Sequence, residues 1–99
     1  MTTPRADAVS AAVTDAVLAV PGVACLRPGL RGLLNAAVRR PGAVRVGLDA
    51  TGSVRALHIE IVARSQYRTA DVARAVRTAA AGAAAAPPTA VKVTVTGIV

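Results

Sequence analysis

The sequence predicts an α+β fold: a single domain with the order helix-strand-strand-strand-helix-strand, in which a small mixed sheet has its helices on one face. Three observations predict it. Between Ala43 and Arg64, apolar and polar residues alternate in two runs separated by a glycine-containing turn, as in a β-hairpin. On both sides of this hairpin, apolar residues recur every three or four positions, as in amphipathic helices. A chain of 99 residues also suits one hydrophobic core.

The N-terminal part of the domain is expected to be a helix followed by a short strand. Residues 1–5 are expected to form a flexible tail, and residues 6–99 the single domain. The helix begins near Ala6, and Pro21-Gly22 ends it. One face of this helix carries a valine stripe, formed by Val9, Val13, Val17 and Val20. The next four residues, 23–26, are apolar and are interpreted as an edge strand.

Residues 27–42 lie between two Pro-Gly pairs and leave two interpretations open. On a helix, the leucines near Leu30 and Leu33 would share one side, and Arg31 and Arg39 the other. Such a helix packs its leucines on the domain core, or it lies on a membrane surface. The same segment contains Gly29-Leu30-Arg31-Gly32, which matches the GxxG loop of RNA-binding KH modules.

The hairpin is predicted to place one apolar row from each strand on the same face of the sheet, where helices cover it. These rows are Val44, Val46 and Leu48 in the first strand and Leu57, Ile59, Ile61 and Ala63 in the second. Residues 49–53 form the turn. The polar row between them includes Arg45, His58 and Glu60 and is predicted to be exposed.

A second helix and a last strand complete the predicted fold. Thr69 is expected to cap the helix, whose buried stripe is Val72, Ala73, Val76 and Ala80, and Pro87-Pro88 ends it. The valines of residues 90–96 alternate with Lys92 and threonines, which predicts a strand. Because a helix connects the two, this strand is expected to run parallel to residues 57–63.

The positive charge of the chain permits an anionic partner without identifying one. The chain has eleven arginines and one lysine but only five acidic residues, which gives a net charge of +7. Coding bias in a GC-rich genome is the alternative explanation of the arginines. If the charge is functional, the contacts with an anionic partner are assigned to Arg31, Arg39, Arg40 and Arg45. Tyr67 is the sole aromatic residue, which disfavours a base-stacking surface or an enzyme pocket.

No catalytic, cofactor-binding or metal-binding set is predicted. His58 and Glu60 share one strand face but lack the further ligands that a metal needs. They are interpreted instead as part of a cross-strand ionic patch with Arg45 and Lys92. Cys25 is interpreted as a small buried apolar residue rather than a nucleophile, and a lone cysteine fits a reducing cytoplasm. No apolar run suits a membrane span.

Several phrases of the sequence are similar to those of a known family. They are Pro21-Gly22-Val23 after the first helix, Gly42-Ala43-Val44-Arg45-Val46, the segment from Val54 to Val62, Tyr67 with Thr69 and Asp71-Val72-Ala73, and the closing Val91-Lys92-Val93-Thr94-Val95-Thr96-Gly97-Ile98-Val99. Over residues 6–99 this resembles the alkaline shock protein family, or envelope stress response family, of Gram-positive bacteria. The chain departs from the family in having Ala86-Pro87-Pro88-Thr89 where a glycine usually precedes the last strand. It also lacks a longer charged N-terminal strand segment.

The resemblance implies a non-enzymatic cytoplasmic protein that acts through protein–protein contacts at the inner face of the membrane. It implies no catalytic residues and no cofactor. A membrane-anchored protein and further copies of the chain are the implied partners. Edge pairing at the strands of Val23 and Val91 is the expected mode of self-association. The alternative function is a small basic, KH-like nucleic-acid-binding module.

Overall fold

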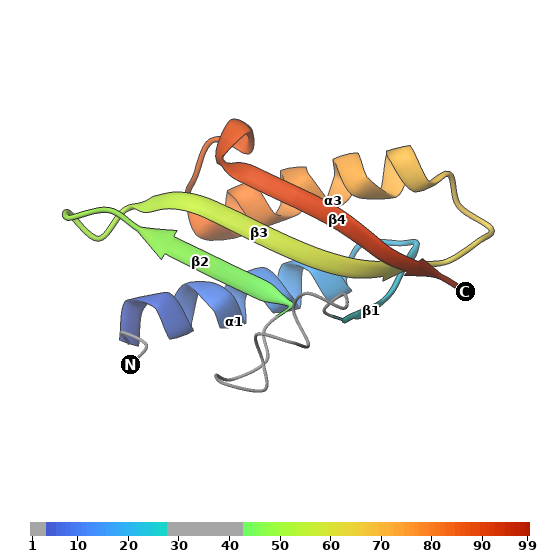
Figure 1. The fold of residues 1–99 in the computed structure, drawn as a ribbon, viewed down its shortest axis with the longest axis horizontal. Helices are drawn as coiled ribbons and strands as arrows, with labels where there is room; N and C mark the ends of the chain where they lie inside the picture. Colours follow the sequence, from blue (N-terminus) through green and yellow to red (C-terminus); the bar gives the residue numbers. More distant parts are fainter. Residues whose placement is uncertain (1–3, 28–42) are drawn as a thin grey trace.

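The computed structural model describes residues 4–27 and 43–99 and has the predicted α+β architecture (Figure 1). Helix α1 spans Pro4–Leu18, and strand β1 spans Val23–Leu26. Strands β2 (Val44–Leu48) and β3 (Val54–Ala63) form the hairpin. Helix α3 (Thr69–Ala84), a 3-10 turn η1 (Pro88–Ala90) and strand β4 (Val91–Ile98) follow. The predicted segment 27–42 falls outside the described residues except for Arg27, so its helix and its GxxG loop stay predictions.

Strand β3 is the centre of the sheet because all other described strands pair with it. Along one edge, β1 and β2 both pair antiparallel with β3, with Leu26 opposite Ile61 and Val44 opposite Ile59. Along the other edge, β4 pairs parallel with β3, so that Ile59 lies beside Val93. The predicted mixed sheet and the parallel relation of the last two strands are confirmed.

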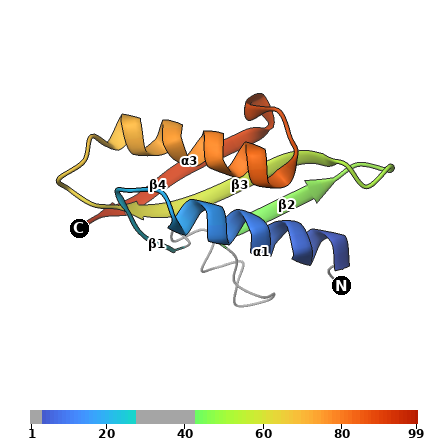
Figure 2. The same cartoon turned by 180° about the vertical axis from the view of Figure 1, so that it is seen from behind.

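Both helices cover the same face of the sheet (Figures 1 and 2). The valine stripe of α1, with Val13 and Val17 fully buried, packs in one cluster with Val72 and Val76 of α3. The apolar rows of the strands complete this core; its β3 members are Leu57, Ile59, Ile61 and Ala63. The opposite face, called the open face below, carries the alternate residues of the strands. No described helix lies on it.

The ends of the helices differ from the predicted ones. Helix α1 begins at Pro4, so residues 4 and 5 are helical rather than part of a tail. The N-cap of α3 is Arg68, and its side chain makes no capping bond. Thr69 is therefore the first residue of the helix, and its prediction as the cap is wrong. The helix passes Gly82 and ends at Ala84, because Ala85 takes a left-handed conformation with φ of 52°.

The hairpin turn is held by one carboxylate. Oδ1 of Asp49 accepts hydrogen bonds from the backbone N–H groups of Thr51 and Ser53 at 2.8 and 3.0 Å, and from the Thr51 hydroxyl. These bonds, that of the Thr51 hydroxyl first, lower the pKa of Asp49 from its ordinary value of 3.8. Arg5 at the start of α1 donates from Nε to the carbonyl of Gly52 at 2.6 Å, which ties the turn to the helix.

Candidate interaction surface

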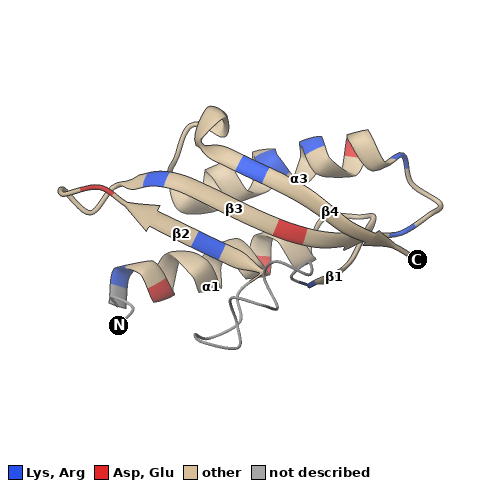
Figure 3. Ribbon diagram, viewed as in Figure 1, with Lys and Arg blue, Asp and Glu red and all other residues tan. Residues whose placement is uncertain are grey.

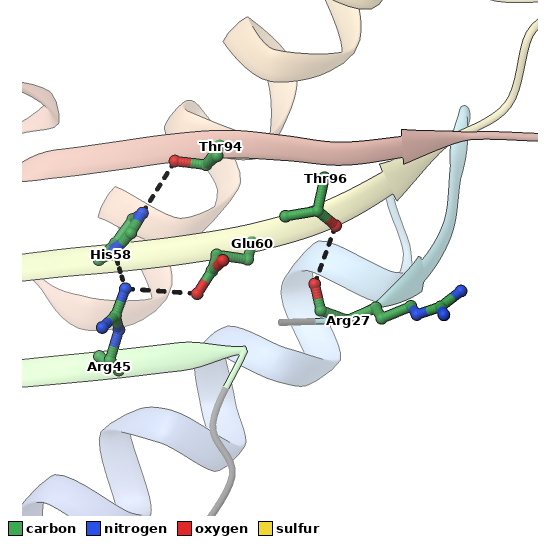
Figure 4. A network of polar contacts seen from close by, with 6 residues as sticks. All are labelled: Arg27, Arg45, His58, Glu60, Thr94 and Thr96. Carbon is green, nitrogen blue, oxygen red and sulfur yellow. Dashed lines mark hydrogen bonds and ion pairs between the residues drawn. The ribbon is translucent and has the colours of Figure 1, made fainter. Parts of the chain in front are cut away.

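The polar residues of the hairpin meet on the open face, at the middle of the sheet. The strand register places Arg45 of β2 opposite His58 of β3, and places His58 beside Lys92 of β4. Glu60 follows two residues after His58 on the same face and lies beside Thr94. Four of these side chains are hydrogen-bonded into one network, which Figure 4 shows from close by: Arg45, His58, Glu60 and Thr94.

The guanidinium of Arg45 joins the two residues of β3. Its Nη2 contacts Nδ1 of His58, and the same nitrogen lies 3.3 Å from Oε1 of Glu60 (Figure 4). On the other side of the ring, Nε2 of His58 lies 2.8 Å from the hydroxyl of Thr94. The predicted ionic patch is confirmed for Arg45, His58 and Glu60, and β4 adds a threonine hydroxyl to it.

These contacts determine the protonation state of His58. A guanidinium can only donate hydrogen bonds, so Nδ1 of His58 must accept and carries no proton. The ring proton of the neutral form is then on Nε2, which donates it to Thr94. Burial lowers the pKa of His58 below its ordinary 6.5, and the charges of Arg45 and Lys92 lower it further, while Glu60 acts in the opposite direction.

The free energy of unfolding is therefore expected to fall as the pH drops below 6.5. Above that pH, His58 is neutral in both the folded and the unfolded chain. Below it, the unfolded chain takes up a proton first, so acid favours unfolding until the folded chain is protonated as well. Urea unfolding between about pH 7.5 and pH 5.5 measures this slope, because carboxylates titrate mainly below that range. The variant His58→Gln, which cannot titrate, is expected to have a flatter profile; equal slopes in both proteins would contradict the assignment.

Glu60 is buried, although the sequence predicts an exposed polar row. The side chain of Glu60 is 6% exposed, against 46% for the side chain of Arg45. Its backbone also joins two distant parts of the chain, since its N–H donates to the carbonyl of Ala43 at 2.8 Å and its carbonyl accepts from the N–H of Arg27 at 3.2 Å. The chain thus leaves the sheet at Arg27 and returns to it at Ala43, and both of these residues bond to the backbone of Glu60.

Strand β4 is fixed to β1 near this point through Thr96. The Thr96 hydroxyl donates to the carbonyl of Arg27 at 3.0 Å (Figure 4). It also lies 3.2 Å from the carbonyl of Ile61. The register between β3 and β4 shifts at this position, because Ile61 pairs with Val95 but Val62 pairs with Gly97. This β-bulge explains how the hydroxyl reaches backbone groups of other strands.

The structure describes the position of one of the four arginines that are predicted to contact an anionic partner. Arg45 lies on the open face, whereas residues 31, 39 and 40 fall outside the described residues. The other described cations lie on α1, β3, α3 and β4, at Arg27 after β1, and in the segment between β3 and α3 (Figure 3). Lys92 belongs to the predicted ionic patch, and its charge lowers the pKa of His58.

Cys25 is exposed, so its predicted burial is wrong. A bulge at β1 lets Val23 pair with Ala63 and Cys25 with Val62, which places the cysteine on the open face, away from the core. Cys25 and His58 are not brought together. Val62 and His58 are four residues apart on β3, or about 13 Å along the strand, which is too far for a nucleophile and its base.

The described residues, 4–27 and 43–99, contain neither a cluster of metal ligands nor a helix suited to crossing a bilayer. Within these ranges, no group of three or more His, Cys, Asp and Glu side chains could hold a metal ion. Among the helices described there, none combines the length and the apolar character needed to cross a bilayer. No protein-family model, curated protein or solved structure matches the chain. The interpretation of the surface therefore rests on its own geometry.

Proposed function

We propose that this protein is a non-enzymatic interaction protein of the envelope stress class, acting at the inner face of the cytoplasmic membrane. Its partners are a membrane-anchored protein and further copies of the same chain. The observation that carries the proposal is the combination of an open sheet face and an unpaired sheet edge. Both offer contacts to a second protein, and the family resemblance supplies the cellular setting.

The unpaired edge belongs to β4. Within the described residues this strand pairs with β3 alone, so the backbone groups on its other side have no strand partner there. Such an edge can add a strand from another chain. Lys92 is the single charged residue of β4 and lies near one end of it. In an antiparallel pair of two copies centred on Thr94, each Lys92 would face Thr96 of the other chain, so the two ammonium groups would not meet.

Fluorescent tagging in the native host, combined with crosslinking and purification from cells, tests the proposal. The expected result is a signal enriched at the membrane and a crosslinked membrane protein that co-purifies with the tagged chain. Light scattering of the purified protein over a range of concentrations tests self-association separately. The fluorescent tag alone is the control. A diffuse signal without any co-purifying membrane protein would remove the proposed function.

A further inference from the structure

We infer that the open face holds a proton-sensitive binding surface for an acidic segment of a partner protein, centred on a row formed by Arg45, His58 and Lys92. This inference rests on the proposed function, because it gives the chemistry of the partner. The row crosses three neighbouring strands, since Arg45 lies opposite His58 and His58 beside Lys92. Arg45 and Lys92 are exposed and His58 is half-buried. These three residues, Arg45, His58 and Lys92, are called the cation row below.

The groups that face His58 come from each strand packed beside it. Arg45 approaches from β2, Lys92 and the Thr94 hydroxyl from β4, and Glu60 from its own strand. With His58 neutral, two cations and one carboxylate give a net charge of one at this centre. Protonation raises it to two. It also breaks the contact between Arg45 and Nδ1, because both groups are then donors.

Beside the cation row, the open face carries two small residues. Gly47 and Ala56 are opposite each other on β2 and β3, and they occupy the next positions of the open face toward the turn. A Cβ built on Gly47 would lie 3.7 Å from that of Ala56, so no clash requires a glycine here. Neither of them carries a long side chain that would hold a bound chain away from Arg45 and His58.

Proton and ligand binding are linked at this surface. A carboxylate bound at the cation row is attracted to Arg45 and Lys92. Its negative charge also offsets the repulsion between these two cations and a protonated His58. A ligand that favours protonated His58 must, by reciprocity, bind more tightly when the proton is present. The surface therefore binds an acidic segment more tightly as the pH falls below 6.5.

The chemistry of the row favours acidic protein over nucleic acid. The chain has no Phe or Trp for base stacking, and its one tyrosine, Tyr67, lies in the segment between β3 and α3. Glu60 stands within the network and would repel a run of phosphates, whereas one or two carboxylates can contact Arg45 and Lys92 on either side of His58.

The test measures binding of a fluorescently labelled peptide that carries two glutamates, separated by serine and glycine residues, to the full chain by anisotropy. It is done at about pH 7.5 and about pH 5.8, where glutamates stay ionised, and in about 50 mM salt to limit screening. Affinity is expected to increase about fivefold at the lower pH. The variant Lys92→Gln should bind less tightly at both pH values. His58→Gln should retain binding at the higher pH and lose the increase.

Arg77→Gln is the matched control, because it removes one exposed cation from α3, on the helix side of the sheet. It should bind the peptide as the unchanged protein does. The inference would be overturned by no binding at either pH, by equal losses in Lys92→Gln and Arg77→Gln, or by an increase in affinity at the lower pH that persists in His58→Gln. Tighter binding of a single-stranded RNA of equal charge would also overturn it. None of these results affects membrane enrichment in cells, so the two proposals fail separately.

Discussion

Replacing Gly22 by alanine is expected to destabilise the fold by about 2–4 kcal/mol, through backbone strain and overpacking together. Gly22 has φ of +95°, a conformation that side chains disfavour. A Cβ there would also lie 2.6 Å from Cγ2 of Val72 and 3.0 Å from Cγ of Tyr67. Val72 is 2% exposed and has little freedom to move. The carbonyl of Gly22 accepts a hydrogen bond from the backbone N–H of Arg64 at 2.7 Å. A shift of the Gly22 backbone would therefore disturb the end of β3.

Urea unfolding of Gly22→Ala and Gly82→Ala gives a matched comparison of the same substitution at two glycines. A Cβ at Gly82 meets nothing within 4 Å, and the residue lies inside α3. Alanine there should stabilise the protein by about 0.5–1 kcal/mol, since it is the better helix former. If both variants change stability in the same direction, the strained turn after α1 is not the reason for the glycine.

Replacing Ile59 by alanine is expected to cost about 2–5 kcal/mol, the usual range for deleting a large aliphatic side chain from a core. Ile59 is fully buried on β3 and has Val44 on one side and Val93 on the other. Helices on one side and strands on the others leave the cavity few ways to close. For a small domain this is a large fraction of the total stability.

The control is Ile98→Ala, which deletes the same atoms at a position that is 57% exposed. Its effect is expected to stay within about 0.5 kcal/mol. Thermal or urea unfolding followed by circular dichroism measures both. Similar losses at the two positions would mean that β3 is not the centre of the core.

The elements of the fold could be predicted from local patterns, because burial on one face repeats with the period of the element. The valine stripe of α1 and the alternation of β3 are of this kind. The candidate surface could be predicted only in part. Arg45, His58 and Glu60 belong to the polar row of one hairpin, but Thr94 joins them through the register of a parallel strand that is distant in sequence.

Two failures have local structural reasons. Cys25 was expected inside because cysteine is a frequent core residue, but a bulge in a four-residue strand changed which residues face the helices. Glu60 was expected outside because it belongs to the polar row, yet its backbone lies where two segments join the sheet. Neither a bulge nor such a junction has a signature in the spacing of residues.

The arrangement of the strands around β3 also has a consequence for hydrogen exchange. Because β1, β2 and β4 each pair with β3 and, among the described strands, none pairs with another, each can separate without breaking the other two pairings. Amides of the outer strands can thus exchange through partial openings. Each amide of β3 donates to a single neighbouring strand, so it is released when that strand separates. Exchange rates along β3 should therefore fall into two groups, one for the amides that face β1 or β2 and one for the amides that face β4.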